Sequence, residues 1–167
     1  PEPIMCDKVH HLGIFSFLKG SCPKKVEARH VIQAVEFIYQ INQFRACAGD
    51  GILPNASEAC FSVNEHLKSV ERRLIKLACL EGDMEHVKQA REFVEKFLIR
   101  KWSQIKEYIE KVIRKIDVEK CLSQEERILS PSDFGFHNTL ESEHGDLSFI
   151  DFEYAGWDDP VKLICDF

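Results

Sequence analysis

Apolar side chains recur at helical spacing over the first two-thirds of the chain, and this periodicity limits the possible folds more than any other feature. Residues three, four and seven positions apart share one face of an α-helix, so each apolar stripe predicts a helix that packs against a core. Ser21-Cys22-Pro23 is typical of a helix start. The first stripe after it is formed by Ala28, Val31, Ile32, Val35, Ile38 and Tyr39.

A predicted loop over residues 46–59, which contains Gly49, Gly51, Pro54 and Asn55, separates this stripe from two longer ones. Ser62 and Glu65 form a capping-box pattern at the start of a second predicted helix. A third pattern covers residues 84–116, and this unusual length predicts a kink or break near Trp102-Ser103. Core packing is the simplest role for all three stripes.

A short apolar and aromatic run over residues 12–18 stands before the first stripe and is closed by Lys19-Gly20. Its length and composition predict a buried strand. No partner strand for it is evident nearby in the sequence.

The pattern changes after Cys121, where short apolar runs alternate with polar turns. The runs at Ile128-Leu129, Thr139-Leu140 and 147–150 predict a small β-rich patch. We therefore predict an α+β fold that is mostly helical and carries a small β-hairpin, with the polar chemistry concentrated in that hairpin.

The hairpin register follows from its turn. With Glu143-His144-Gly145-Asp146 as the turn, antiparallel pairing sets Leu140 opposite Phe149 and Asn138 opposite Asp151. A two-residue turn at His144-Gly145 gives the same register. Directly opposed residues have Cα atoms about 4.5–5.5 Å apart and side chains on the same face. The hairpin is therefore predicted to bring an amide oxygen and a carboxylate to one point.

Asn138 and Asp151 suit a hard cation such as Mg²⁺, which binds oxygen ligands and leaves positions for water and phosphate. Asp133, on the preceding loop, can face the same ligand. One Asp that accepts the proton of an attacking hydroxyl, together with an Asn and a second Asp that hold a metal, is the set of residues used in kinase-type phosphoryl transfer.

Asp133-Phe134-Gly135 also spells the metal-binding triplet of protein kinases. That interpretation requires a catalytic Asp about 15–20 residues upstream, with an Asn five residues after it. The only Asp in that range is Asp117, and Leu122 follows it five residues later. The triplet interpretation therefore fails, whereas Asp133, Asn138 and Asp151 satisfy the catalytic pattern.

These residues resemble the aminoglycoside phosphotransferase-like family, which includes sugar, choline and homoserine kinases on a protein-kinase-like fold. The family's H-G-D-x-x-x-x-N loop is similar to residues 131–138, and its I-D-F/W-E block is similar to Ile150-Asp151-Phe152-Glu153. The Ala-Gly and Asp-Pro pairs that often follow are similar to Ala155-Gly156 and Asp159-Pro160. The resemblance implies that Asp133 is the catalytic base and that Asn138 and Asp151 are magnesium ligands.

The chain departs from the family pattern at two positions. Pro131 stands where the family has a His, two residues before the catalytic Asp. Leu163 stands where the family often has an Asp, three residues after Asp-Pro. Both departures leave the rate and the substrate class open.

The resemblance also implies a domain organisation. Residues 1–20 are expected to be the end of an N-terminal lobe and its hinge, where the backbone of Phe17, Leu18 and Lys19 meets the adenine of ATP. Residues 21–167 are expected to be the helical C-terminal lobe with the catalytic loop. The Lys that grips the ATP phosphates in the family has no counterpart here, so we expect a piece of a longer protein, truncated at both ends.

The implied function is ATP-dependent transfer of a phosphoryl group to a hydroxyl of a small molecule, with ATP and Mg²⁺ as cofactors. The alternative is a non-catalytic kinase-like binding module, which Pro131 and the missing Lys favour. A purely helical interaction domain is a third interpretation, but it leaves the predicted metal geometry of the hairpin unexplained.

The composition limits the possible binding partners and the cellular compartment of the protein. The formal charge of -6 disfavours nucleic acid, because phosphate binding requires a basic face. The seven cysteines include no CxxC pair, so neither a zinc site nor a disulfide framework is indicated, and free thiols fit a reducing compartment. No apolar run approaches 18 residues and no signal-peptide pattern opens the chain, so we expect a cytoplasmic protein without membrane partners.

Several other polar residues near the hairpin have two possible roles. Glu153 can touch a second metal or hold the loop, and His137 can contact phosphate, although a surface role is favoured for it and for the other histidines. Trp157-Asp158-Asp159 can line a substrate mouth, but a helix cap at Asp159 before Pro160 is the preferred interpretation.

Overall fold

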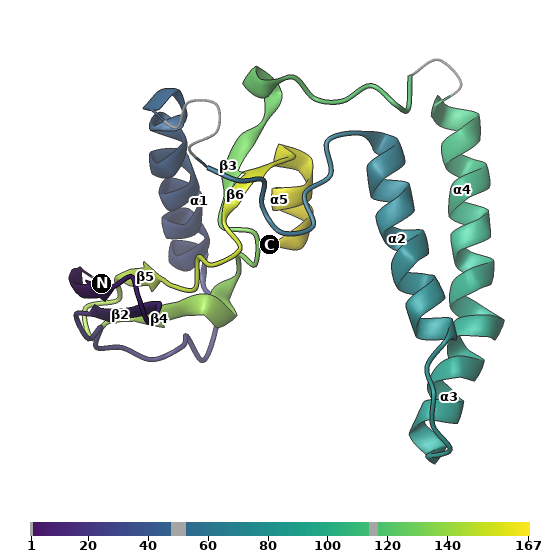
Figure 1. Cartoon of the computed structure of the whole chain (residues 1–167), viewed down its shortest axis with the longest axis horizontal. Coiled ribbons are helices and arrows are strands. Elements are labelled where there is room, and N and C mark those ends of the chain that lie inside the picture. Colours follow the sequence, from purple (N-terminus) through teal and green to yellow (C-terminus); the bar gives the residue numbers. More distant parts are fainter. Residues whose placement is uncertain (1, 48–52, 114–116) are drawn as a thin grey trace. The chain divides into compact units, whose positions relative to one another are not determined.

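The structure is a computed structural model, and it describes residues 2–47, 53–113 and 117–167. The predicted loop over 46–59 and the predicted third helix each extend partly outside these residues. Helices and strands are mixed (Figure 1), which confirms the α+β class. In the described part of the chain, no helix combines the length and the apolar character needed to cross a membrane.

The chain divides into two compact units, and each is described by itself. Residues Pro1–Ser57 and Ile128–Phe167 form the first, which we call the discontinuous unit. Residues Glu58–Arg127 form the second, which we call the helical unit. This division differs from the predicted boundary at residue 20, because segments from both ends of the chain build one unit.

The helical unit contains α2 (Val63–Ala78), α3 (Glu85–Phe93) and α4 (Ile99–Ile113). The predicted cap of α2 is present, since the Ser62 hydroxyl accepts the backbone N–H of Glu65 at 3.2 Å. The Glu65 carboxylate accepts the N–H of Phe61 rather than that of Ser62, at 2.5 Å. The capping box is therefore confirmed at Ser62 and displaced by one residue at Glu65.

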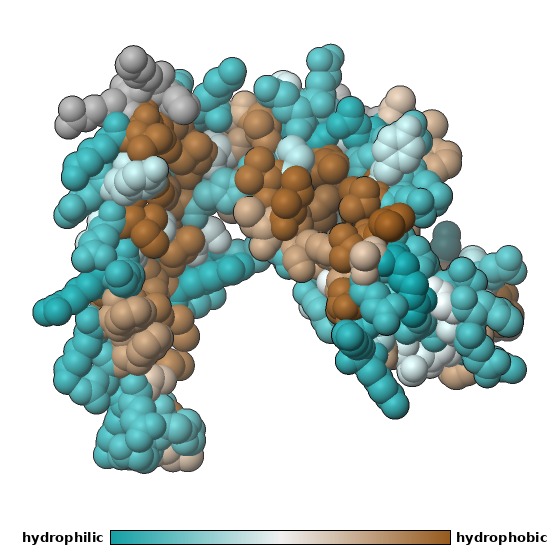
Figure 2. Space-filling model, turned by 180° about the vertical axis from the view of Figure 1, so that it is seen from behind, coloured by the Kyte–Doolittle hydropathy of each residue, from teal (hydrophilic) through white to brown (hydrophobic). Residues whose placement is uncertain are grey.

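A π-helical segment, η2 (Val94–Leu98), joins α3 to α4. The long predicted helix is thus interrupted, but at Val94–Leu98 rather than near Trp102-Ser103, which lie inside α4. Val94 is buried, and so is Phe61 before α2. Other apolar side chains of these helices stay exposed, including Val70, Leu77, Phe97 and Val112. Figure 2 shows apolar side chains gathered along this unit, so the predicted core role holds only in part.

The discontinuous unit begins with a two-stranded antiparallel hairpin, in which β1 (Pro3–Asp7) pairs with β2 (Leu12–Phe15). The predicted strand over 12–18 therefore has a partner close in sequence, and its predicted burial is wrong because β2 is exposed along its length. β1 carries no alternation of apolar and polar residues, since neither of its faces is buried against a core.

Helix α1 (Ala28–Gln43) starts later than Ser21-Cys22-Pro23 predicts. Ser21 instead makes two backbone hydrogen bonds with Glu141, of 3.2 and 2.9 Å, which hold this segment in an extended conformation. The buried face of α1 is centred on His30 and Ala34, each 1% exposed. The surface role predicted for His30 is therefore wrong. Val31 and Val35, from the predicted stripe, line an open apolar groove of about 350 Å³.

The remaining strands and the last helix close the discontinuous unit. β3 (Ile128–Ser130) pairs with β6 (Gly156–Asp158), and α5 (Pro160–Asp166) follows directly. The Asp159 carboxylate accepts the N–H of Val161 at 2.7 Å with Pro160 at the first helical position, which confirms the preferred cap interpretation. The core is formed by Ala34, Phe134, Phe149 and Leu163, with Phe37, Ile38, Ile128 and Leu147 packed against it.

Candidate functional site

The hairpin formed by β4 (Thr139–Glu141) and β5 (Leu147–Phe149) is present, but its register differs by one residue from the prediction. Leu140 lies opposite Ser148 rather than Phe149. The reason is the loop: Ser142 donates its N–H to the Asp146 carbonyl at 2.9 Å, which leaves three residues between them. Gly145 has a φ of 87° and supplies the left-handed position that such a loop requires.

This register moves Asn138 and Asp151 relative to each other. Ile150 donates its N–H to the Asn138 carbonyl at 3.0 Å, so Asn138 pairs with Ile150 and Asp151 follows the pairing. The predicted direct opposition of Asn138 and Asp151 is therefore wrong, since a shift of one residue exchanges the two faces of a strand. Asp151 has a φ of 68°, which turns the chain sharply where β5 ends. No hydrogen bond within the described residues joins the two side chains.

The loop that carries Asp133 is fixed by its neighbours on both sides. Phe134 is buried in the core and stacks on Phe37, with ring centroids 5.9 Å apart. Ser132 has a φ of 71°, and its hydroxyl donates to the Ser57 carbonyl at 3.0 Å. A non-glycine residue in this region costs of order 1 kcal/mol and persists where the surroundings impose it, often at functional sites. Asp133 is thus held between a buried anchor and a strained residue.

The Asp133 carboxylate faces outward, with 59% of its side chain exposed. Its Oδ2 lies 3.3 Å from Nδ2 of Asn138, and the same Nδ2 donates to the Asp133 carbonyl at 2.9 Å. Its Oδ1 lies 3.2 Å from Nε2 of His137. The structure therefore brings together Asp133 and Asn138 as predicted, and it adds His137, for which the sequence favoured a surface role over contact with phosphate.

The carboxylates of Asp133 and Asp151 both influence the pKa of one neighbouring side chain, Tyr154. A hydrogen bond to Glu153 raises the pKa of the Tyr154 phenol above 10.0, and the negative charges of Glu153, Asp151 and Asp133 add to this effect. Asp151 and Asp133 therefore lie within electrostatic range of a single side chain.

The predicted protein ligands can hold Mg²⁺ only together with oxygens from water and a bound phosphate. Among the described residues, no group of three or more His, Cys, Asp or Glu side chains is arranged to hold a metal. Mg²⁺ commonly binds one or two protein oxygens and completes its shell with water and phosphate. Asn138 directs Nδ2 toward Asp133, so its Oδ1 remains available to a cation. Such a site would use Asn138 Oδ1 and the Asp151 carboxylate as its protein oxygens, and this assignment stays a prediction.

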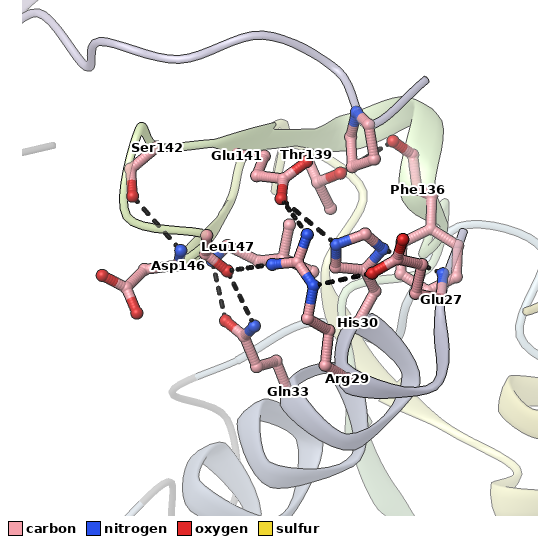
Figure 3. A network of polar contacts seen from close by, with 12 residues as sticks. Glu27, Arg29, His30, Gln33, Phe136, Thr139, Glu141, Ser142, Asp146 and Leu147 are labelled. Atoms are coloured by element: carbon pink, nitrogen blue, oxygen red, sulfur yellow. Dashed lines mark hydrogen bonds and ion pairs between the residues drawn. The ribbon is translucent and has the colours of Figure 1, made fainter. Parts of the chain in front are cut away.

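A polar network attaches the hairpin to α1 (Figure 3). Arg29 donates to Glu141 at 2.6 Å and to the Gly145 carbonyl at 3.1 Å, while Gln33 donates to the same carbonyl at 3.0 Å. Gln33 also accepts the N–H of Leu147 at 2.8 Å. Because α1 holds both strands and the loop between them, the segment that bears Asn138 and Asp151 is fixed to the core.

This network was not predicted from the sequence, although Arg29 and Gln33 are four residues apart on one helix face. The hydrogen bond from Arg29 is the main cause that lowers the pKa of Glu141 from 4.5, and a contact from His30 adds to it. His30 Nδ1 accepts the N–H of Glu27 at 3.1 Å, so its Nε2 is the protonated nitrogen that faces Glu141 at 3.3 Å.

The predicted hinge lies beside a second cavity. An open pocket of about 620 Å³ is lined by Lys19, Gly20, Ser21, Glu141, Ser142, Glu143 and His144. Of the three predicted hinge residues, Lys19 lines this pocket, whereas Phe17 is 88% exposed. The pocket is formed by the predicted hinge on one side and the hairpin loop on the other.

Comparison of the chain with protein-family models, with curated proteins and with solved structures found no match.

Proposed function

We propose that this chain carries the phosphoryl-transfer site of a small-molecule kinase that resembles the aminoglycoside phosphotransferase-like family. The observation that carries the proposal is the loop on which Asn138 holds Asp133 by its Nδ2 while its own Oδ1 remains available. An exposed carboxylate beside a free amide oxygen is the arrangement that kinase-type transfer requires of one loop.

In the proposed reaction, Asp133 orients the acceptor hydroxyl and accepts its proton as the oxygen attacks the γ-phosphate of ATP. Asn138 and Asp151 would hold Mg²⁺, which when bound neutralises charge on the phosphates. The buried Phe134 and the Ser132 hydroxyl keep the loop fixed. This rigidity matters because positioning supplies much of the rate in phosphoryl transfer.

The backbone at Ser132 supports the resemblance. The family motif has glycine immediately before the catalytic Asp, and Ser132 at that position adopts the left-handed conformation that glycine favours, with a φ of 71°. The family His is replaced by Pro131, but two other hydrogen bonds hold the loop. Ser130 Oγ accepts the N–H of Ser132 at 3.0 Å, and Ser132 Oγ reaches Ser57.

The pocket beside Lys19 is the proposed place for the nucleotide. It is lined by Lys19, Gly20 and Ser21 and by the loop end of the hairpin, residues 141–144, and strand β4 leads from that loop to Asn138. A hinge segment beside the active-site hairpin is the surrounding that the resemblance implies for the adenine of ATP.

A second candidate function is a kinase-like module that binds nucleotide without turning it over. The offset between Asn138 and Asp151 in the hairpin register favours it, because two metal ligands on directly opposed residues would form a more complete site.

Calorimetric titration with ATP tests the proposed site, with and without Mg²⁺. The proposal expects Mg²⁺-dependent binding that Asp151→Asn and Asn138→Ala each weaken about tenfold or more. Asn138→Ala removes a metal ligand, and Asp151→Asn removes the negative charge of the other ligand. Asp83→Asn changes an exposed aspartate of the helical unit and should leave the affinity unchanged. Binding that is equally tight without Mg²⁺, or in Asp151→Asn, would contradict the proposed metal ligands. Binding without ADP formation when hexoses, choline and homoserine are supplied as acceptors would identify the non-catalytic module.

A further inference from the structure

The Asp133 carboxylate is held at both of its oxygens. Asn138 Nδ2 lies 3.3 Å from Oδ2, and His137 Nε2 lies 3.2 Å from Oδ1. An ionised carboxylate only accepts hydrogen bonds, so the nitrogen of His137 that faces it must carry the proton. His137 therefore donates to Asp133, four residues before it in the chain, from η4 (Phe136–Asn138).

The position of the His137 ring depends on Gly135. A methyl group on Gly135 would lie 2.7 Å from Nδ1 and 2.8 Å from Cε1 of His137. Apart from its chain neighbours, it would meet no other atom of the described residues within 4 Å. Gly135 has a φ of -177°, an extended conformation open to any residue. Space for the imidazole, rather than backbone conformation, is thus the local reason for glycine at this position.

We propose that His137 is a positioning residue for Asp133, and that Gly135 provides the space in which its ring reaches the carboxylate. This inference rests on the proposed function, in which Asp133 orients the acceptor hydroxyl. An aspartate with most of its side chain exposed samples several rotamers, and only some of them place an oxygen against the hydroxyl. A donor on Oδ1 and another on Oδ2 restrict the carboxylate to one orientation.

If His137 had only a structural role, its loss would lower the stability of the discontinuous unit and leave the turnover number of the folded protein unchanged. The side chains of His137 and Asp133 are 62% and 59% exposed, and exposed pairs of this kind add little to stability. Loss of the contact should therefore leave the folded unit intact and lower the turnover number. A role in substrate binding would instead raise KM.

The kinetic test uses the whole chain with Mg²⁺ and ATP, with ADP formation measured against hexoses, choline and homoserine as acceptors. We expect His137→Ala to lower kcat about tenfold, with KM for the acceptor changed less than about twofold. His137→Gln keeps an N–H at a similar reach and should restore most of kcat. His86→Ala, an exposed histidine of the helical unit, should leave both constants unchanged.

Gly135→Ala provides the sharper test, because its only proposed effect is to move the His137 ring. Alone, it should lower kcat as much as His137→Ala does. In the His137→Ala background it should have no further effect, since residues that act through one contact are not additive. Additive losses, a Gly135→Ala variant with normal kcat, or a His137→Gln variant as slow as His137→Ala would each overturn the inference.

The outcome also separates this inference from the proposed function. If the unchanged chain turns over ATP and Asp133→Asn abolishes turnover while the His137 variants are normal, only the inference fails. If no turnover occurs, the proposed function fails, and nitrogen-15 NMR of the His137 ring decides whether the contact exists. A protonated Nε2 whose resonance shifts in both Asp133→Asn and Gly135→Ala supports the contact, and a resonance indifferent to both excludes it.

Discussion

The two units are stabilised in different ways. In the discontinuous unit, short segments distant in sequence meet around four buried side chains, and a polar network attaches the hairpin to α1. In the helical unit, long helices follow a local repeat, and apolar side chains such as Phe97 stay exposed. All the predicted site residues lie in the discontinuous unit. The proposed site thus lies where distant segments fix side chains, rather than where the helical repeat is strongest.

The chain offers a natural probe for each unit. One of its two tryptophans, Trp157, is buried in β6 of the discontinuous unit, and the other, Trp102, lies in α4 of the helical unit. A Trp102→Phe background reports unfolding of the first by fluorescence, and a Trp157→Phe background reports the second. Each comparison below is measured by urea unfolding in both backgrounds.

Loss of an aromatic side chain should have the largest effect and should differ most between the units. Phe134→Ala should destabilise the discontinuous unit by about 4 kcal/mol, because it leaves a cavity in the core. Phe97→Ala, at a residue that is 49% exposed in the helical unit, should cost about 1 kcal/mol or less. Equal losses in the two units would contradict the difference in packing.

Removal of a lysine from an ion pair should have the next largest effect. Lys162 bonds Asp158 at 3.1 Å, and the Asp158 side chain is fully buried. Lys162→Ala should cost about 3 kcal/mol, because a buried carboxylate loses its partner charge. Lys106 pairs with Glu71 at 2.8 Å, and both side chains are 40% exposed, so Lys106→Ala should cost much less. A larger loss of stability for Lys106→Ala than for Lys162→Ala would contradict the role given to burial of the carboxylate.

Acidification should produce the smallest change in the free energy of unfolding, and this change should occur in both units. Arg29 lowers the pKa of Glu141, and Lys106 lowers that of Glu71, each from 4.5. A carboxylate with a lowered folded pKa contributes stability above its unfolded value, and this contribution is lost as the pH falls through the folded value. At pH 7, Glu141→Gln and Glu71→Gln should each have a lower free energy of unfolding than the unchanged chain. This difference should shrink below about pH 4.5. A difference that grows on acidification would contradict both assigned pairs.

Local signals in the sequence predicted the parts of the fold that local interactions determine. Ser62 and Asp159 cap helices as expected, because a cap requires only the residue and the N–H groups that follow it. The strands at Ile128, Thr139 and Leu147 were located because each is a short apolar run between turns. Asp133 and Asn138 meet because they share one short loop.

The predictions from sequence were wrong where contacts between distant segments determine the structure. Helix α1 starts late because Ser21 pairs with Glu141, far along the chain, and its buried face depends on what packs against it. The hairpin register depends on whether the loop has two, three or four residues, and Gly145 is compatible with each. The ring of His137 reaches Asp133 only through the space at Gly135, which no helical or strand repeat indicates.

The central claim is that Asp133 is the base of an ATP-dependent phosphoryl transfer. The most direct measurement is Mg²⁺-dependent ADP formation, with hexoses, choline and homoserine as acceptors, by the unchanged chain and by Asp133→Asn. The substitution keeps the size of the side chain and removes its proton-accepting charge. We predict measurable turnover that falls at least about 100-fold in the variant, with unchanged ATP affinity and unfolding transition. Turnover that survives in Asp133→Asn, or none in the unchanged chain, would contradict the claim.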